Sequence, residues 1–243
     1  MLMLVTRPEP DAQATRERLA ALDINALAAP LMTRQNLPAR LPPPNGFAAL
    51  ALTSTNALRA LADREALGPF RDTKVFAVGD RTAHEARLLG FTDVVAAEGT
   101  LQSLVTAIAL ARLEGPVFYP AGRHMSGDLA QALAPHGLMV VTVPVYEMVA
   151  QSSLPRETAS GLKEGAFGAV LVYSRRTAEI FCTLAGPALD GERRRTLPML
   201  CISENVAAPL LESQFSRILL ADHPSEEAMM ALALAFAREQ SGP

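Results

Sequence analysis

The chain has 243 residues, of which 49% are hydrophobic and 19% are charged. This composition is typical of a folded globular protein, and the length can bury a sizeable core as one large or two ordinary domains. The formal net charge is −3 and no basic run is longer than Arg193-Arg194-Arg195, which argues against a nucleic-acid partner. The longest run without a polar residue, 228–237, is too short to cross a bilayer, so no membrane partner is expected.

The N-terminal apolar stretch is interrupted at Arg7 and Pro8, before the hydrophobic region of a signal peptide could form. The only two cysteines, Cys182 and Cys201, lie in apolar segments and predict reduced, buried thiols. Both features favour a cytoplasmic protein. The arginine triplet 193–195 lies between glycine and proline and predicts a solvated loop.

Apolar, β-branched segments alternate with segments of helical periodicity along the whole chain. The predicted strands are 2–6, 25–29, 47–53, 74–79, 93–96, 116–119, 140–150, 168–173, 198–202 and 217–221. Two segments rich in proline, glycine or polar residues, 37–46 and 151–165, predict linkers, and 120–124 (PAGRH) predicts a turn. Ten strands alternating with helices predict an α/β fold with parallel sheets covered on both faces, and their number suits two five-stranded sheets.

The segment 140–150, VVTVPVYEMVA, predicts a buried strand that passes directly into a second extended segment. Pro144 has no backbone donor, so it is expected at a strand end or edge. Tyr146 follows at once and can be interpreted in two ways. It packs in the core with its hydroxyl satisfied, or its phenol reaches a ligand as a proton donor.

The same pattern occurs earlier, in 21–32 (ALDINALAAPLM), where Pro30 lies 114 residues before Pro144. Three further pairs of segments repeat in the same order. They are centred on Ser54 and Ser174 (offset 120), Gly79 and Ser203 (offset 124), and Phe91 and Phe215 (offset 124). The repeats predict a duplicated α/β unit in the order a b c d a′ b′ c′ d′.

Common catalytic and cofactor signatures are missing. The sequence contains no GxGxxG, GxxxxGK[ST], HExxH or GxSxG, and its four histidines lack metal-ligand spacing. No metal, cofactor or conventional triad is therefore predicted. Thr6-Arg7 stands where a response regulator would carry acidic residues, and 53–56 (TSTN) only faintly resembles a flavin phosphate loop.

Hydroxyl or amide residues recur where strands turn into helices. They are Ser54, Thr82, Ser126, Ser174, Ser203, Asn205 and Ser225. The simplest interpretation is helix N-capping. A second, compatible interpretation is that several helix N-termini face one cleft and bind a ligand with many carboxylates. Arginines close to these turns would add positive charge: Arg7, Arg81, Arg123, Arg175 and Arg176.

A set of short motifs in fixed order resembles the uroporphyrinogen-III synthase family over nearly the full length. The motifs are LVTRP (4–8), APL (29–31), LTSTNA (52–57), FAVGDRTA (76–83), AAEGT (96–100), PAGR (120–123), VPVYEMVA (143–150), LVYSRRTAE (171–179) and LCISENVAA (200–208). One departure is that some members carry paired threonines where this chain has Asn205-Val206, beside Glu204.

The resemblance implies two flavodoxin-like lobes with parallel sheets, joined by two extended crossover strands. Lobe 1 would be 1–31 with 151–243, lobe 2 would be 38–143, and the linker strands would be 32–37 and 144–150. The repeat alone equally allows each lobe to be contiguous.

The resemblance also implies a reaction of tetrapyrrole (heme) biosynthesis. Linear hydroxymethylbilane would close to uroporphyrinogen III with loss of water and inversion of the terminal pyrrole ring, without a metal or cofactor. The partner would be this polycarboxylate substrate, bound by a monomer. Tyr146 corresponds to the tyrosine expected to help the hydroxyl depart. The expected substrate-binding residues are Arg7, Ser54, Thr82, Arg123, Ser174 and Ser203.

Two other functions remain open from the residues alone. One is a non-catalytic bilobed protein that closes on a small anion, which needs the same turns but no Tyr146. The other is a flavodoxin-like redox or phosphotransfer protein, which the missing signatures disfavour.

Overall fold

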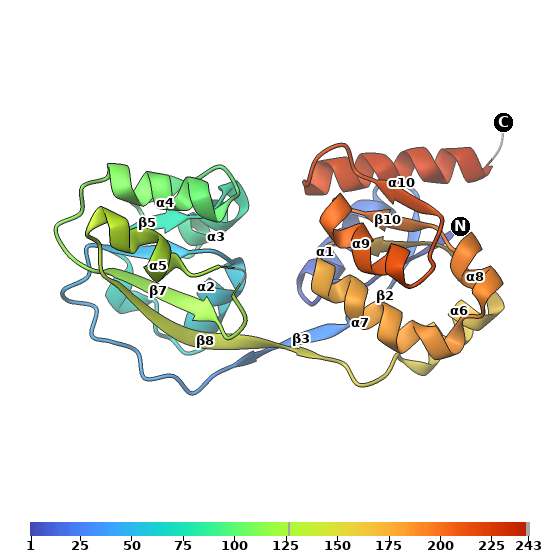
Figure 1. The fold of residues 1–243 in the computed structure, drawn as a ribbon, viewed down its shortest axis with the longest axis horizontal. Helices are drawn as coiled ribbons and strands as arrows, with labels where there is room; N and C mark the ends of the chain where they lie inside the picture. The colour runs from blue at the N-terminus through green and yellow to red at the C-terminus, as the bar shows by residue number, and fades with distance from the viewer. Residues whose placement is uncertain (126, 242–243) are drawn as a thin grey trace. The chain divides into compact units, whose positions relative to one another are not determined.

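A computed structural model of the protein describes residues 1–125 and 127–241. The chain forms two compact units. Unit 1 comprises Met1–Thr33 and Val149–Pro243, and unit 2 comprises Arg34–Met148. The chain therefore passes from one unit to the other twice, and each unit has its own sheet and its own helices (Figure 1).

Unit 1 is built on a five-stranded parallel sheet. Its strands are β1 (Leu2–Val5), β2 (Asn25–Ala28), β9 (Phe167–Val172), β10 (Met199–Cys201) and β11 (Ile218–Leu220). They lie in the order β11-β10-β9-β1-β2, so the strand order reverses between β1 and β9. This is the second-first-third-fourth-fifth order of flavodoxin-like sheets.

Helices cover both faces of this sheet. They are α1 (Asp11–Ala20), α6 (Arg156–Glu164), α7 (Arg175–Ala185), α8 (Gly191–Thr196), α9 (Glu204–Glu212) and α10 (Glu226–Ser241), with a 3-10 turn, η3 (Gly186–Ala188). Alternate strand residues enter two different cores. Leu4 and Val170 pack with α6, α7 and α9, whereas Met3 and Leu171 pack with α1 and α10. Successive side chains of a strand point to opposite faces of the sheet, so the position of a residue in the strand decides which helices it contacts.

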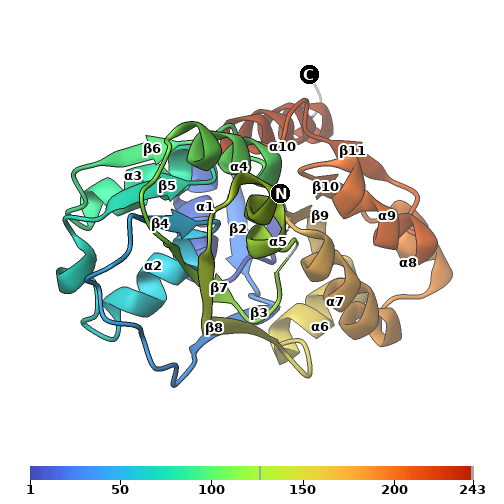
Figure 2. The same ribbon diagram turned by 60° about the vertical axis from the view of Figure 1, so that its left-hand side comes forward.

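Unit 2 contains a six-stranded sheet. Its strands are β3 (Met32–Asn36), β4 (Ala49–Leu52), β5 (Lys74–Ala77), β6 (Val94–Ala96), β7 (Val117–Gly122) and β8 (Val140–Ala150). Their order is β3-β8-β7-β4-β5-β6, and β8 lies between β3 and β7 (Figure 2). The neighbouring strands from β8 through β7, β4 and β5 to β6 are all paired in parallel. The order reverses at β4, which has β5 on one side and β7 on the other.

The helices of unit 2 also form two layers. They are α2 (Thr55–Ala62), α3 (Asp80–Leu88), α4 (Leu101–Leu110) and α5 (Leu129–Leu133), with 3-10 turns η1 (Gly68–Phe70) and η2 (Ala134–His136). α2 and α3 pack against Leu50 and Phe118 on one face. α4 and α5 pack against Ala51 and Val117 on the other.

The predicted α/β class with parallel sheets is confirmed, but the strand count was wrong. The described residues form eleven strands, in sheets of five and six. The strand missing from the chain-order prediction is β3, whose residues MTRQN are mostly polar and exposed.

Segment 151–165 was wrongly predicted to be a linker, because it contains α6. Only Thr158, Gly161 and Leu162 are buried in this helix, and its remaining residues are polar enough to hide the helical pattern. The arginine triplet is not a loop either, since it lies in the short helix α8.

One strand runs further than predicted, since β7 continues through the expected turn to Gly122. β8 covers the predicted segment 140–150, but Pro144 lies inside the strand and not at the end or edge where it was expected. Pro144 pairs with Ala121 immediately before the register shifts between Ala121 and Gly122. An irregular ladder of this kind tolerates the missing donor of a proline.

No helix in the described part of the chain is long and apolar enough to span a membrane.

Candidate functional site

The carboxyl ends of β4 and β7 meet where the strand order of unit 2 reverses, the usual ligand position in an open parallel sheet. Two hydroxyl groups are paired there. Thr53 follows β4 and Tyr119 lies in β7, and their side-chain oxygens are 2.9 Å apart. Burial raises the pKa of Tyr119 above 10, with smaller upward effects from Tyr146 and Asp128, so its phenol is neutral at physiological pH.

Tyr146 lies on the neighbouring strand β8 and is 9% exposed. Its ring lies directly over Gly122 of β7, where an added Cβ would be 2.8 Å from the ring carbon Cζ. In the described residues the Tyr146 hydroxyl has no hydrogen-bond partner, unlike that of Tyr119. The ring is therefore fixed by packing, while its donor remains available.

Arg123 continues this edge of the sheet directly after β7. Its backbone N–H donates to the carbonyl of Tyr146 at 2.8 Å. Its guanidinium pairs with Glu147 at 2.9 Å and is about half exposed. A charge-assisted pair with one exposed partner leaves Arg123 donors for a further anion.

Ser54 and Thr82 occupy the first turns of two helices that follow β4 and β5. Ser54 is the N-cap of α2, and its hydroxyl accepts from the N–H of Asn56 at 3.1 Å. Thr82 is buried in the first turn of α3, whose N-cap is Gly79 and has no side-chain cap. Gly79 is closely approached by Gly99, with 3.4 Å between an added Cβ and the Gly99 Cα. These helix starts present backbone amides at the same edge of the sheet as Tyr146.

In unit 1, Arg7 follows β1 and is only 8% exposed. It pairs with Glu226 at the start of α10 and with Asp11 at 3.4 Å, and it donates to the Thr15 hydroxyl at 3.0 Å. Its guanidinium carbon lies 4.0 Å from the ring centre of Tyr173. The charge proposed from the sequence to bind substrate is thus compensated by carboxylates of the protein itself.

Glu226 is the centre of this partly buried network. Besides Arg7, it accepts from the hydroxyls of Thr15 at 3.1 Å and Tyr173 at 3.2 Å. Burial, followed by the charge of Glu226, raises the pKa of Tyr173 well above its usual value. The network joins the end of β1, the end of β9 and the first turn of α10.

Ser174 and Ser203 follow β9 and β10. Ser174 caps α7, accepting from the N–H of Thr177 at 3.2 Å. Ser203 is the N-cap of α9 but makes no side-chain capping bond. Arg175 donates to Asn205 at 3.4 Å, which links the two helix starts. Ser126, another turn residue from the sequence, lies outside the described residues.

The structure therefore sorts the predicted residues into two groups. Tyr146, Arg123, Ser54 and Thr82 lie at the carboxyl edge of the sheet of unit 2. Arg7, Ser174 and Ser203 follow three adjacent strands of unit 1.

Sequence reasoning missed five residues of these edges: Thr53, Tyr119, Gly122, Tyr173 and Glu226. Thr53 and Gly122 lie inside the motifs LTSTNA and PAGR, so those motifs carried a usable signal. No local pattern marks Glu226, which is 219 positions from Arg7.

The chemistry at these edges is that of hydroxyls, amides and guanidinium groups. Among residues 1–125 and 127–241, no group of three histidine, cysteine, aspartate or glutamate side chains could hold a metal ion. Both cysteines are free thiols, and burial raises the pKa of each. Such a site can bind and orient an anionic ligand and donate a proton from a neutral phenol.

A family model described as "Uroporphyrinogen-III synthase HemD" matches residues 13–231. The fold is similar to the crystal structure of uroporphyrinogen-III synthetase from Helicobacter pylori 26695. That match has a TM-score of 0.67 and 20% identity, and covers 97% of this chain and 99% of that one. A mutant uroporphyrinogen III synthase from the extremely thermophilic bacterium Thermus thermophilus matches with a TM-score of 0.57 and 16% identity, over 98% and 100% of the chains. No curated protein matched the sequence.

Proposed function

The chain belongs to the uroporphyrinogen-III synthase family of hydro-lyases, and on that premise we propose that it converts hydroxymethylbilane into uroporphyrinogen III. In this reaction the substrate loses its terminal hydroxyl as water, and the far pyrrole then attacks to form a spiro intermediate. Ring closure leaves the terminal pyrrole inverted. The observation that carries the proposal is the family match over residues 13–231.

Tyr146 is the residue we assign to the loss of water. A departing hydroxyl needs a proton, and a phenol with a free donor can supply a hydrogen bond or the proton itself. Support comes from the Tyr146 hydroxyl, which has no partner within the described residues, and from the packing of its ring on Gly122. The pyrrole electrons supply most of the driving force, so only mild acid assistance is required.

The substrate's acetate and propionate arms need several anion sites. We assign the first turns of α2 and α3, with Ser54 and Thr82, and the exposed side of Arg123 to this role. Backbone amides at helix starts favour carboxylates through both hydrogen bonds and the helix dipole. Ser174 and Ser203 would do the same in unit 1. Catalysis would then consist largely of positioning, which alone can lower a barrier by about 7–11 kcal/mol.

Isomer analysis of the product tests the activity. The purified chain is incubated with hydroxymethylbilane and the uroporphyrinogen isomers are separated. We expect the type III isomer. A protein that only binds the substrate would leave the type I isomer, which forms spontaneously, and that result would end the proposal.

Tyr146→Phe tests the assigned acid. We expect turnover to fall about 10–100-fold with KM nearly unchanged, less than the full effect of a strong general acid. Tyr173→Phe is the matched control, because its hydroxyl is bonded to Glu226 and is not available to substrate. Unchanged turnover in Tyr146→Phe would return Tyr146 to a packing role.

We also propose that the protein acts as a monomer in the cytoplasm. Its two free cysteines are in keeping with a reducing compartment.

A further inference from the structure

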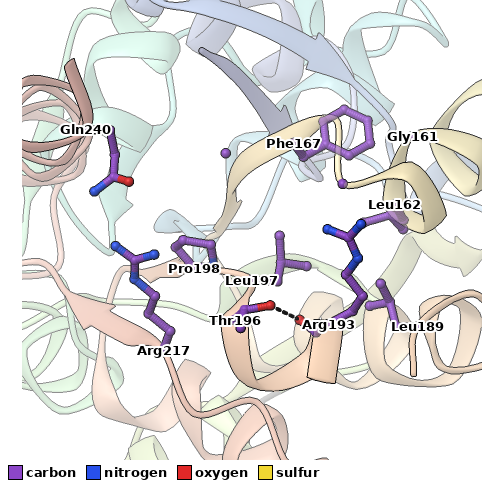
Figure 3. Close-up of a pocket in the computed structure, with 12 residues that line it drawn as sticks. Gly161, Leu162, Phe167, Leu189, Arg193, Thr196, Leu197, Pro198, Arg217 and Gln240 are labelled. Carbon is purple, nitrogen blue, oxygen red and sulfur yellow. Dashed lines mark hydrogen bonds between the residues drawn. The ribbon is translucent and has the colours of Figure 1, made fainter. Parts of the chain in front are cut away.

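Unit 1 contains a pocket at the amino end of its sheet, the edge opposite to Arg7, Ser174 and Ser203 (Figure 3). Phe167 begins β9, and Pro198 and Arg217 immediately precede β10 and β11. The cavity has a volume of about 270 Å³. This is close to the lower limit for small-molecule sites, so the pocket suits one ring and is far too small for a tetrapyrrole.

The inner wall of the pocket is apolar. It is formed by side chains from α6, β9, the segment after η3 and the end of α8: Leu162, Phe167, Leu189 and Leu197. All four are buried. A ligand with an apolar body would remove further apolar surface from water here, whereas a small inorganic ion would gain nothing from this wall.

The rim carries two guanidinium groups. Arg193 comes from α8 and Arg217 from the start of β11, and Figure 3 shows them on opposite sides of the pocket, with the amide of Gln240 near Arg217. None of the described residues that line the pocket is acidic. Among the described residues, neither arginine forms an ion pair, and neither guanidinium donates a hydrogen bond.

Both arginines have structural contacts that leave their donors unused. The guanidinium of Arg217 lies 5.3 Å from the ring centre of Phe236. That of Arg193 lies where a Cβ on Gly165 would be, and Gly165 ends α6 with a φ of +72°. Both arginines are exposed, so two positive groups lie beside an apolar wall with donors that are open to a ligand. A bidentate carboxylate matches the donor fork of each group.

We propose that this pocket binds a small organic dianion, in which an apolar ring or chain joins two carboxylate groups. The ligand site is distinct from the tetrapyrrole site and does not depend on the proposed reaction. One carboxylate pairs with Arg193 and the other with Arg217, while the body of the ligand lies on Phe167 and Leu197.

Calorimetric titration of the full chain tests the proposal at constant ionic strength. The probes are isophthalate, which has two carboxylates on a ring, benzoate, which has one, and inorganic phosphate, which has no apolar body. We expect saturable binding of isophthalate, at least about tenfold tighter than that of benzoate or phosphate, since a hydrogen bond to a charged group is worth about a factor of ten or more.

Substitutions then assign the binding to the pocket. Arg193→Gln and Arg217→Gln should each weaken isophthalate binding about 10–100-fold. Arg195→Gln is the matched control, because Arg195 is an exposed arginine of the same helix that does not line the pocket. It should leave the affinity unchanged.

Three results would overturn the proposal. One is the absence of saturable heat with isophthalate at millimolar concentration. Another is equal affinity for isophthalate, benzoate and phosphate, which would remove the requirement for two charges on an apolar body. The third is undiminished binding in both Arg193→Gln and Arg217→Gln.

Discussion

Gly122→Ala tests whether a bare backbone position on β7 is what fixes Tyr146. An added Cβ would lie 2.8 Å from Cζ and 2.9 Å from the hydroxyl oxygen of Tyr146. Ordinary carbon contacts begin near 3.5 Å, so the ring must move by about 0.7 Å. It cannot do so freely, because the backbones of Gly122 and Tyr146 are paired between two strands.

The expected cost has two opposing parts. Overpacking a well-packed position lowers the free energy of unfolding by about 1–3 kcal/mol. Replacing glycine by alanine raises it by about 0.4–1 kcal/mol, because alanine reduces the conformational entropy of the unfolded chain. The free energy of unfolding should therefore fall by about 0.5–2 kcal/mol. If Tyr146 acts on the substrate, the displaced phenol should also lower turnover about 10–100-fold, because positional errors near 1 Å have effects of that size.

Urea denaturation followed by far-ultraviolet circular dichroism measures the first effect, and isomer-resolved kinetics measures the second. A double-mutant cycle isolates the contact, since Gly122→Ala should cost nothing when Tyr146 is already alanine. Gly68→Ala is the control, because a Cβ there meets nothing within 4 Å. Equal destabilisation by Gly122→Ala with and without the Tyr146 ring would refute the reasoning.

Two further predictions concern unit 1. Glu226→Gln should lower the free energy of unfolding by about 1.5–3 kcal/mol, because it removes the partly buried charge that compensates the buried Arg7. Glu227→Gln, whose side chain is 77% exposed, should change the free energy of unfolding by less than about 1 kcal/mol in the same urea titration. Similar effects for both would contradict the assigned role of Glu226. Burial raises the pKa of the Cys201 thiol from 9.0 to about 12, so its contribution to stability is fully present below pH 9 and is lost as the pH rises towards 12. Cys201→Ala should therefore reduce the alkaline slope of stability by up to about 1.4 kcal/mol per pH unit in urea titrations from pH 8 to 10.5, and an unchanged slope would exclude Cys201 as a cause.

Local features of the fold were predictable because their causes act over a few residues. Short apolar segments predicted the strands that became β4, β5 and β9, and the serines before α2 and α7 cap those helices. The same logic failed where the local signal was weak. The polar strand β3 and the mostly polar helix α6 owe their conformation to neighbours distant in sequence and not to their own composition.

The site was only partly predictable. Motif order indicated Tyr146, Ser54, Thr82 and Arg123, and the structure places all four at one edge of one sheet. The sequence motifs gave no sign that Thr53 and Tyr119 are hydrogen-bond partners, because these residues are 66 positions apart. Arg7 illustrates the limit most clearly. An arginine after a strand predicts anion binding equally well whether that anion is a ligand or, as here, a glutamate near the other end of the chain.

The sequence by itself determined the α/β class and the family, since each depends on residue type and spacing along the chain. Only the tertiary structure decided that β1 lies beside β9 and that β7 lies beside β4. It alone revealed that Arg193 and Arg217 share an apolar pocket. The physical reason is that neighbours in a sheet and walls of a cavity are selected by the packing of whole faces, which no short window of sequence contains.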